Sequence, residues 1–455
     1  MLESSAQLER HTERHLKVAS KFSTVAWVVC ALIVAVLLAN PFPTLQAAQT
    51  ELSSSDDLHT AWNNTVKLYL ERTPSSPGDF YYAGEFMMVP LHAAFERNDS
   101  AWEHDFADHF ARVAQSPESV TTDRLSRLQY LYLGSEFLVL CNESGHPELI
   151  PSSLPRLVYE SIDKVWTKEP SWQWDHPSFT GGMRERIEWK LNTRNTPKSF
   201  YRAILDEDFF AMAIAADLKA YGRGPDSIKG WSSTLDDVLA EAYKILSQEV
   251  VFEPGGGWVF QPGVWRDHAD FKYAGNREAR AGLKEAPLNK IGWDTSHFLR
   301  FPLWLTSFIR AYPSSDPKHA FYEKLRDGLE KQFFDRVLVG PSQDFPGFRT
   351  TNYMDGSNGV FRWNYSSLGN NNGYGPYESS GNLSLGWWTF LGTDRVRQMY
   401  GALVMQFTQS KEVRQLYVGP TRTRTYSASD LDQNSSANQL KVLIMRLASQ
   451  LPKEG

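Results

Sequence analysis

Cysteine is almost absent from this chain. Only two of its 455 residues are cysteines, Cys30 and Cys141. Cys30 falls within an apolar run near the N-terminus, so Cys141 stands alone in the rest of the chain. One remaining thiol excludes an internal disulfide framework. For an exported protein, this shortage favours a bacterial periplasm over a eukaryotic lumen.

The chain also lacks an excess of positive charge and the common catalytic motifs. Its formal net charge is -6, which excludes the basic footprint of a nucleic-acid-binding protein. It has no HExxH, GxGxxG or P-loop motif, and no GxSxG in a suitable context. His268 and His297, with Asp267 and Asp294, are metal-ligand residue types, but their spacing demands no metal. We therefore expect neither a metal nor a cofactor.

Long apolar runs are missing everywhere except at residues 23–40, which carry no charge. This run is at the short end of what spans a bilayer as a helix. The basic residues before it favour a cytoplasmic N-terminus. The sequence thus predicts a cytoplasmic tail at 1–22, a transmembrane anchor at 23–40, a linker at 41–57 and an extracytoplasmic domain at 58–455.

A cleaved signal peptide is the alternative for the same apolar run. The long segment before it and the lack of a clean A-x-A site favour a retained anchor instead. Both interpretations place the main domain outside the cytoplasm. We expect a single-pass protein of the bacterial inner membrane with its main domain in the periplasm.

After the linker the pattern is mostly helical. Apolar spacing along one face predicts helices at 58–70, 86–97, 121–140, 154–165, 199–221, 235–246, 296–312, 318–334, 383–407 and 438–447. Thr234 and Asp237 resemble a capping box for the sixth helix. Asp316 is a suitable N-cap, and Pro317 a suitable first residue, for the eighth.

Three long segments, 169–186, 251–290 and 340–378, separate these helices and are rich in aromatic residues. Loops of such length in a compact domain are usually functional or disordered, and their aromatic content argues against disorder. Short strands are expected within 257–265 and 359–365. The alternation of helices and long loops suggests helix pairs arranged in a ring, with the loops gathered at one end.

Tryptophan is unusually abundant, and 12 of the 15 tryptophans lie between Trp166 and Trp388. Some will simply fill the core. The others occur in loops rich in Gly, Pro and Asp, as at Trp172, Trp174, Trp258, Trp265, Trp293 and Trp363. Loop tryptophans beside polar groups suit a ligand with flat apolar faces and many hydroxyls, such as a sugar chain.

Three clusters contain residues that could carry chemistry. The first, 256–273, places His268 among aromatic residues. In the second, 292–305, Asp294 is a plausible N-cap, and His297 and Arg300 are three residues apart, so they should share a helix face. The third, 352–388, is rich in Gly, Asn and aromatic residues, and Tyr374 lies between two glycines where the backbone can approach a ligand.

The segment Trp293-Asp294-Thr295-Ser296-His297 precedes an aromatic helix, and Asp355-Gly356-Ser357 is followed by Tyr374-Gly375. In these motifs the chain resembles the α/α-toroid enzymes that act on polysaccharides, either uronic acid lyases and epimerases or glycoside hydrolases. In some toroid lyases, a histidine lies between the DGS stretch and the catalytic tyrosine. Here asparagines fill that interval. The resemblance implies a mainly α fold, an α/α toroid with short β hairpins.

The resemblance also implies roles for the candidate residues. In a lyase or epimerase, Tyr374 or His297 would be the base, and Arg300 or an asparagine would neutralise the substrate carboxylate. In a hydrolase, Asp294 and Glu378 would be the carboxylate pair, with Asp267 in reserve. His268 is a further catalytic candidate. The predicted substrate-binding residues are Trp258, Trp265, Trp293, Trp363, Arg362, Asn364 and Asn371.

Two other functions remain open at this point. The protein could be a non-catalytic glycan-binding or scaffold subunit of a polymer-export complex. It could also be a periplasmic toroid enzyme that acts on a hydrophobic small molecule. A long open groove would favour the polymer, and a compact apolar pocket would favour the small ligand.

Overall fold

The computed structural model describes residues 55–116, 120–223, 231–420 and 427–452. The chain divides into two compact units, Met1–His59 and Thr60–Gly455, and the second contains the features described below. The predicted tail at 1–22 and anchor at 23–40 lie outside the described residues. Within the described ranges, no helix has the length and apolar character needed to span a membrane.

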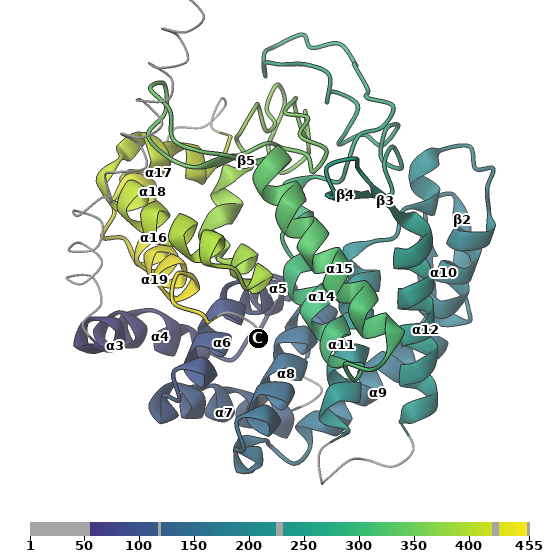
Figure 1. Ribbon diagram of the computed structural model, residues 1–455, viewed down its shortest axis with the longest axis vertical. Coiled ribbons are helices and arrows are strands. Elements are labelled where there is room, and N and C mark those ends of the chain that lie inside the picture. The colour runs from purple at the N-terminus through teal and green to yellow at the C-terminus, as the bar shows by residue number, and fades with distance from the viewer. Residues whose placement is uncertain (1–54, 117–119, 224–230, 421–426, 453–455) are drawn as a thin grey trace, which may run out of the picture. The chain divides into compact units, whose positions relative to one another are not determined.

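The described chain is mainly helical, as predicted (Figure 1). The α-helices are α3 (Ser55–Asn64), α4 (Val66–Leu70), α5 (Pro77–Phe86), α6 (Met88–Glu96), α7 (Ser100–Gln115), α8 (Arg124–Glu143), α9 (Leu154–Thr167), α10 (Gly182–Asn192), α11 (Asp206–Tyr221), α12 (Ser232–Glu249), α13 (Thr295–Phe298), α14 (Phe301–Arg310), α15 (Pro317–Gln332), α16 (Asp394–Gln409), α17 (Lys411–Val418), α18 (Ala428–Leu431) and α19 (Ser436–Ala448). Short 3-10 helices are η2 (Pro147–Leu149), η3 (Ser199–Arg202), η5 (Ser380–Leu385) and η6 (Trp387–Leu391), and a π-helical turn, η4 (Phe333–Val337), follows α15.

The strands of the described chain form three antiparallel two-stranded hairpins. They are β1 (Ser171–Gln173) with β2 (His176–Phe179), β3 (Val250–Phe252) with β4 (Trp258–Phe260), and β5 (Leu338–Val339) with β6 (Arg349–Thr350). The strand expected within 257–265 is β4. Within 359–365 the described chain has only an isolated bridge between Phe361 and Tyr374.

The two predicted helix starts have different outcomes. Asp316 caps α15, since its side chain accepts a hydrogen bond from the backbone N–H of Lys318 at 2.8 Å, and Pro317 is the first helical residue. The capping box at Thr234 and Asp237 was wrong. Helix α12 begins earlier, and the Thr234 hydroxyl donates to Asp163 instead. A tertiary hydrogen bond therefore uses the side chain that the local pattern assigned to a cap.

Several predicted helices are interrupted, and several observed helices were not predicted. The stretch 199–221 breaks before Asp206, and 296–312 is split between α13 and α14 at Arg300. Residues 383–407 begin as 3-10 turns and become α-helical only in α16. Helices α5, α7, α10, α17 and α18 were not predicted. In α7, charged residues lie among the apolar ones, and α10 carries several charges within what read as an aromatic loop.

Helices α8 and α11 are buried on all sides. In α11 the residues from Asp208 to Leu218 are all buried, including Phe209 and Phe210. Helix α8 packs against α5, α6 and α11, α11 packs against α14, and α14 packs against η6. Helix α19 contacts α6, η5 and α16. A helix that is apolar all round must lie inside the protein.

A second group of helices buries only one face. In α9 the buried residues are Leu154, Pro155, Val158, Ile162, Val165 and Trp166, and α12 and α15 have similar stripes. These helices pack outside the first group, α9 and α12 on α11, and α15 on α14. Their remaining faces are polar, as expected for helices that meet solvent.

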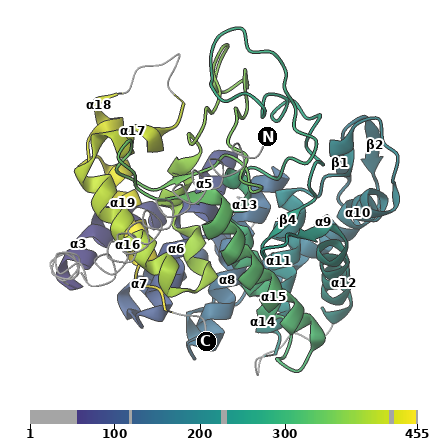
Figure 2. The same ribbon diagram turned by 45° about the horizontal axis from the view of Figure 1, so that its top comes forward.

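The second and third long loops, 251–290 and 340–378, are joined to each other and to Trp293 by backbone hydrogen bonds. Arg362 N–H donates to Asp270 C=O at 2.9 Å, Met354 N–H to Trp293 C=O at 2.9 Å, and Val360 N–H to Asn276 C=O at 3.0 Å. Figure 1 and Figure 2 show these teal and green loops on the same side of α14 and α15. The three aromatic clusters of the sequence therefore meet in space.

A group of charged residues joins α8, α11 and α14 through their C-terminal halves. Glu136 of α8 accepts hydrogen bonds from Arg310 of α14 at 2.5 and 2.6 Å and from Ser307 at 2.9 Å. Asp217 of α11 lies 3.4 Å from the same guanidinium. Burial alone would raise the pKa of Glu136, but Arg310 and His92 lower it to about 2. Burial and the Glu136 charge raise the pKa of Asp217 well above its usual value.

We expect Glu136→Gln to destabilise the protein and to weaken its acid sensitivity. Because the pKa of Glu136 is lower in the folded state, its contribution to stability is present above the unfolded value of about 4.3 and is lost as pH falls toward 2. At neutral pH, the variant leaves Arg310, whose side chain is 16% exposed, without its main partner. Removing one member of a fully buried pair typically costs about 3–5 kcal/mol, which sets the upper limit here. Thermal unfolding between pH 2 and 7 measures both effects.

Glu143→Gln is the matched control, because its carboxylate is half-exposed and lies 4.0 Å from the same arginine. Exposed pairs contribute about 0–1 kcal/mol, so this variant should unfold almost like the native protein. Equal destabilisation by the two substitutions would contradict the role given to Glu136.

Candidate functional site

A cavity of about 330 Å³ lies where the three long loops meet the start of α11. Pockets for small ligands typically have volumes of about 300–1,000 Å³, so this one is at the small end. Its lining residues are Trp174, Leu205, Asp206, Trp265, His268, Asp270, Phe271, Trp293, Asp294, His297, Phe361, Arg362 and Tyr365.

Aromatic rings form much of the wall and support one another. Trp265 lies at the centre, with ring centroids 6.2 Å from Trp174, 5.8 Å from Trp293 and 5.5 Å from Phe271. The indole N–H of Trp293 is buried and has no hydrogen-bond partner among the described residues. An acceptor group on a bound ligand would satisfy it, since buried polar groups are nearly always hydrogen-bonded.

The carboxylate of Asp294 has two functions at the cavity. It caps α13 by accepting the backbone N–H groups of Ser296 and His297, both at 3.1 Å. It also holds the His297 ring, whose Nδ1 lies 2.8 and 2.9 Å from its two oxygens. Burial would raise the pKa of Asp294, but His297 keeps it well below its usual value. The ionised carboxylate places a proton on Nδ1 and leaves Nε2 of His297 for chemistry.

The geometry assigns His268 the opposite tautomer. The backbone N–H of Asp270 donates to its Nδ1 at 3.3 Å, so Nδ1 is the acceptor and Nε2 carries the hydrogen. Burial lowers the pKa of His268, which favours the neutral ring at pH 7. The same cavity therefore holds one imidazole that presents a basic nitrogen and one that presents an N–H donor.

Arg362 reaches the cavity from an unusual backbone conformation. Its φ is 51°, in the left-handed region that bulky residues rarely adopt. Its Nε donates to Asp270 at 3.0 Å, and its guanidinium lies 4.7 Å from the centre of the Tyr365 ring. Strained residues of this kind are concentrated at functional sites. The arginine places a positive charge in the aromatic wall, where it can pair with an anionic ligand group.

A buried polar cluster supports the cavity from α5 and α11. Arg300 donates to the Tyr81 hydroxyl at 2.6 Å and to Glu85 at 3.3 Å, and it lies 3.8 Å from Asp206 of the cavity wall. Burial raises the pKa of Glu85, and Arg300 and His297 partly offset this. Because Arg300 is 1% exposed, it acts as a support rather than as a ligand contact.

The structure brings six of the predicted site residues to this cavity: Trp265, His268, Trp293, Asp294, His297 and Arg362. They come from all three clusters. Arg300 lies behind the wall, and α13 ends before it, so it does not share a continuous helix face with His297. The remaining candidates do not line the cavity.

Trp258 is fully buried, and its indole N–H donates to Leu325 C=O at 2.7 Å. Trp363 is also buried. The backbone of Tyr374 pairs with Phe361, and Glu378 accepts the N–H of Gly375 at 2.7 Å. Asn371 N–H donates to the side chain of Asn364 at 2.6 Å. Trp258 belongs to β4, and the other residues shape the third loop.

Sequence reasoning missed Asp206, Glu85 and Tyr81. Asp206 was hidden because 199–221 read as one helix, whereas the chain bends before α11 and exposes its first residue to the cavity. The acidic run Asp206-Glu207-Asp208 was a usable signal, because acidic residues favour the first turn of a helix. For Glu85 and Tyr81, the local sequence gives no such signal.

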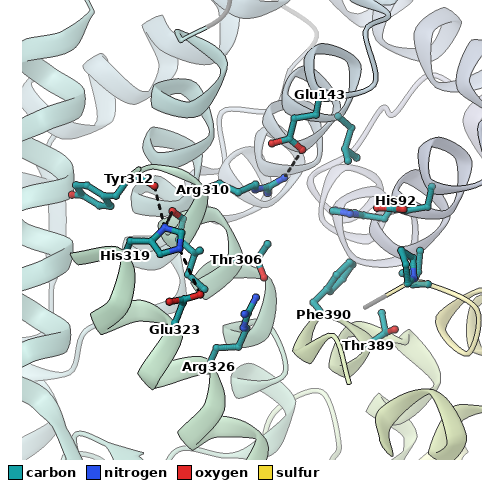
Figure 3. Close-up of a pocket in the computed structure, with 15 residues that line it drawn as sticks. His92, Glu143, Thr306, Arg310, Tyr312, His319, Glu323, Arg326, Thr389 and Phe390 are labelled. Carbon is teal, nitrogen blue, oxygen red and sulfur yellow. Dashed lines mark hydrogen bonds and ion pairs between the residues drawn. The ribbon is translucent and has the colours of Figure 1, made fainter. Parts of the chain in front are cut away.

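A second and larger cavity, about 580 Å³, lies at the C-terminal ends of α6, α8 and α14. Figure 3 shows Arg310 directed toward Glu143, and His319 between Tyr312 and Glu323. Arg310 pairs with Glu143 and His319 with Glu323, so these groups are less available to a ligand. In the part of the chain that the structure describes, no group of three or more His, Cys, Asp or Glu residues is placed to hold a metal.

We expect long-range ¹H–¹⁵N NMR spectra at neutral pH to show the two tautomers directly. His268 should carry its proton on Nε2, and His297 should carry one on Nδ1, because the first accepts a backbone N–H and the second faces a carboxylate. His268→Gln and His297→Gln assign the signals. An Nε2-protonated His297 with a bare Nδ1 would contradict the proposed geometry.

No model of a known protein family matches the chain, and no curated protein is similar to it in sequence. The arrangement of its own side chains must therefore carry any functional assignment. That arrangement is an aromatic cavity with two complementary imidazoles, an arginine and an oriented carboxylate.

Proposed function

We propose that the protein is an acid–base enzyme that acts on a uronate-containing saccharide, as a lyase or an epimerase. The observation that carries this proposal is the pair of imidazoles in opposite tautomers within one aromatic cavity. Proton abstraction beside a carboxylate needs a base and an electrophile near the developing negative charge. The cavity volume fits about one or two sugar rings, which implies action at a chain end.

In the proposed reaction, Nε2 of His297 removes the proton from the carbon beside the uronate carboxylate. Asp294 stabilises the imidazolium that forms. Arg362 pairs with the substrate carboxylate and takes up part of the developing charge. In a lyase, the C–O bond on the adjacent carbon then breaks, Nε2–H of His268 donates a hydrogen bond to the leaving oxygen, and the His297 imidazolium returns the proton to that oxygen. In an epimerase, a proton returns to the opposite face of the same carbon.

A hydrolase mechanism has less support. It requires two available carboxyl groups at the scissile bond. Asp294 is occupied by its helix cap and His297, Asp270 by Arg362, and Asp206 lies 3.8 Å from Arg300, while Glu378 does not line the cavity. The imidazole pair therefore favours proton transfer at carbon over glycosidic hydrolysis.

For the architecture we propose an α/α toroid. The inner members would be α6, α8, α11, α14, η6 and α19, which contact one another largely in chain order, and α19 returns to α6. The amphipathic helices would form the outer layer.

For the cell we propose the arrangement that residues 23–40 predict, a single-pass anchor with the domain in the periplasm and the polysaccharide as its partner. A scaffold role in polymer export has less support, because binding alone needs no oriented imidazole pair.

One observation favours a second candidate, an enzyme acting on a small molecule with a largely apolar body. The cavity is compact, and seven of its 13 lining residues are Trp, Phe, Tyr or Leu. If such a molecule carries an alcohol or ketone group, the same imidazole pair could isomerise it or eliminate water from it.

Solvent-deuterium exchange tests the proposal without a known product. The protein is incubated in D₂O with oligomers of glucuronate, mannuronate and galacturonate, with neutral glucans, and with small cyclic alcohols and ketones. We expect deuterium to enter the uronates, with new ultraviolet absorbance if elimination follows. His297→Gln should lower the exchange rate by about 10²–10⁴-fold, the usual contribution of a positioned acid or base.

His104→Gln is the matched control, because this histidine is exposed on α7 and contacts the local Ser100 carbonyl. This variant should introduce deuterium into uronates at the same rate as the native protein. Exchange on the small cyclic compounds alone would favour the second candidate. Uronate exchange that survives His297→Gln would overturn the assignment of the base.

A further inference from the structure

Trp172 is the largest exposed aromatic side chain near the cavity. It lies on β1, and 51% of its surface is accessible. Its ring centroid is 4.8 Å from that of Trp174, which lines the cavity, and Trp174 is 6.2 Å from Trp265 inside. An aromatic series thus leads from the solvent to the centre of the cavity.

The hairpin that carries Trp172 is held in place by buried charges. Arg186 of α10 is fully buried and donates to the Trp172 carbonyl at 3.1 Å. The same guanidinium pairs with Glu207 and Asp208 at the start of α11, one residue beyond the cavity residue Asp206. Holding an arginine inside the protein requires such partners, because burying an unpaired charge is very costly. The network links the position of Trp172 to that of the cavity wall.

Further contacts restrain the hairpin on its other side. Arg124 donates to the Ser171 hydroxyl at 2.9 Å. The Gln173 side chain donates to Tyr201 C=O, and the Tyr201 hydroxyl donates to Asp175 at the turn. Asp175 itself has a φ of 46°, in the strained left-handed region. An exposed tryptophan on so strongly restrained a hairpin is a preformed surface, since little side-chain or backbone freedom is lost when a ligand binds.

From these observations we propose that Trp172 and Trp174 form an outer subsite that stacks the second sugar ring of the substrate. The inference rests on the proposed saccharide chemistry of the cavity and adds to it the length of the ligand. The ring in the cavity presents the reacting carbon to His297, and the next ring lies against the exposed indole. A sugar ring suits this place because its flat C–H face covers the indole while its hydroxyls stay in water.

Binding measured in a His297→Gln background tests the inference apart from turnover. The probes are glucuronic, mannuronic and galacturonic acid, each as the monosaccharide and as a short oligomer, titrated by tryptophan fluorescence and by calorimetry. We expect Trp172→Ala to weaken oligomer binding by about five- to tenfold, within the range measured for one aromatic contact, and to leave monosaccharide binding unchanged. Trp172→Phe should restore most of the loss, which excludes a folding defect as its cause.

Phe252→Ala is the matched control, because this ring is also exposed, at 41%, but lies on the β3–β4 hairpin and does not line the cavity. It should bind both probes like the parent protein. Equal oligomer binding with and without Trp172 would overturn the inference, as would equal losses for monosaccharide and oligomer. Lipid vesicles serve as a further probe, and a loss of vesicle binding on Trp172→Ala with sugar binding unchanged would also overturn the inference. The same holds if the native protein binds no saccharide. Trp172-dependent oligomer binding without any deuterium exchange would sustain the subsite and reject the proposed chemistry.

Discussion

The site depends on the carboxylate of Asp294. It ends the loop that precedes α13 by satisfying two helix N–H groups, and it orients His297 through Nδ1. The same residue forms a β-bridge with Tyr353 of the third loop. One residue therefore joins two of the three aromatic clusters through its backbone, and its side chain fixes the ring of His297. A local backbone requirement, the helix cap, and a chemical requirement, the tautomer, are met by one group.

The aromatic walls explain how long loops can hold such a site. Loops lack the regular hydrogen bonds of helices, so their stability must come from packing and from bonds to each other. Trp265 contacts rings on both sides, and Arg362 joins its loop to Asp270 through backbone and side chain together. The cost of the left-handed backbone at Arg362 is offset by these fixed partners.

The helices were predictable where one face is apolar and the ends carry clear signals, as at Asp316 and Pro317. Prediction failed where the tertiary structure decides. Thr234 bonds to Asp163 instead of capping its own helix, and Arg300 lies between two helices that the periodicity joined. Asp294, His297 and His268 could be identified from their types and neighbours. Glu85 and Tyr81 could not, because they reach the site from α5, more than 200 residues away from Arg300 in sequence.

Charged residues have different roles at the two ends of the inner helices α8, α11 and α14. At the ends that Glu136, Asp217 and Arg310 join, charges from three helices pair with one another, which fixes the packing. At the loop end, Asp270 and Asp294 bond Nδ1 of the two histidines rather than Nε2, and the N–H of Trp293 has no partner among the described residues. Polar atoms that packing has oriented but not satisfied are what a ligand can bind. This difference, more than cavity size, is why we assign the proposed function to the smaller of the two cavities.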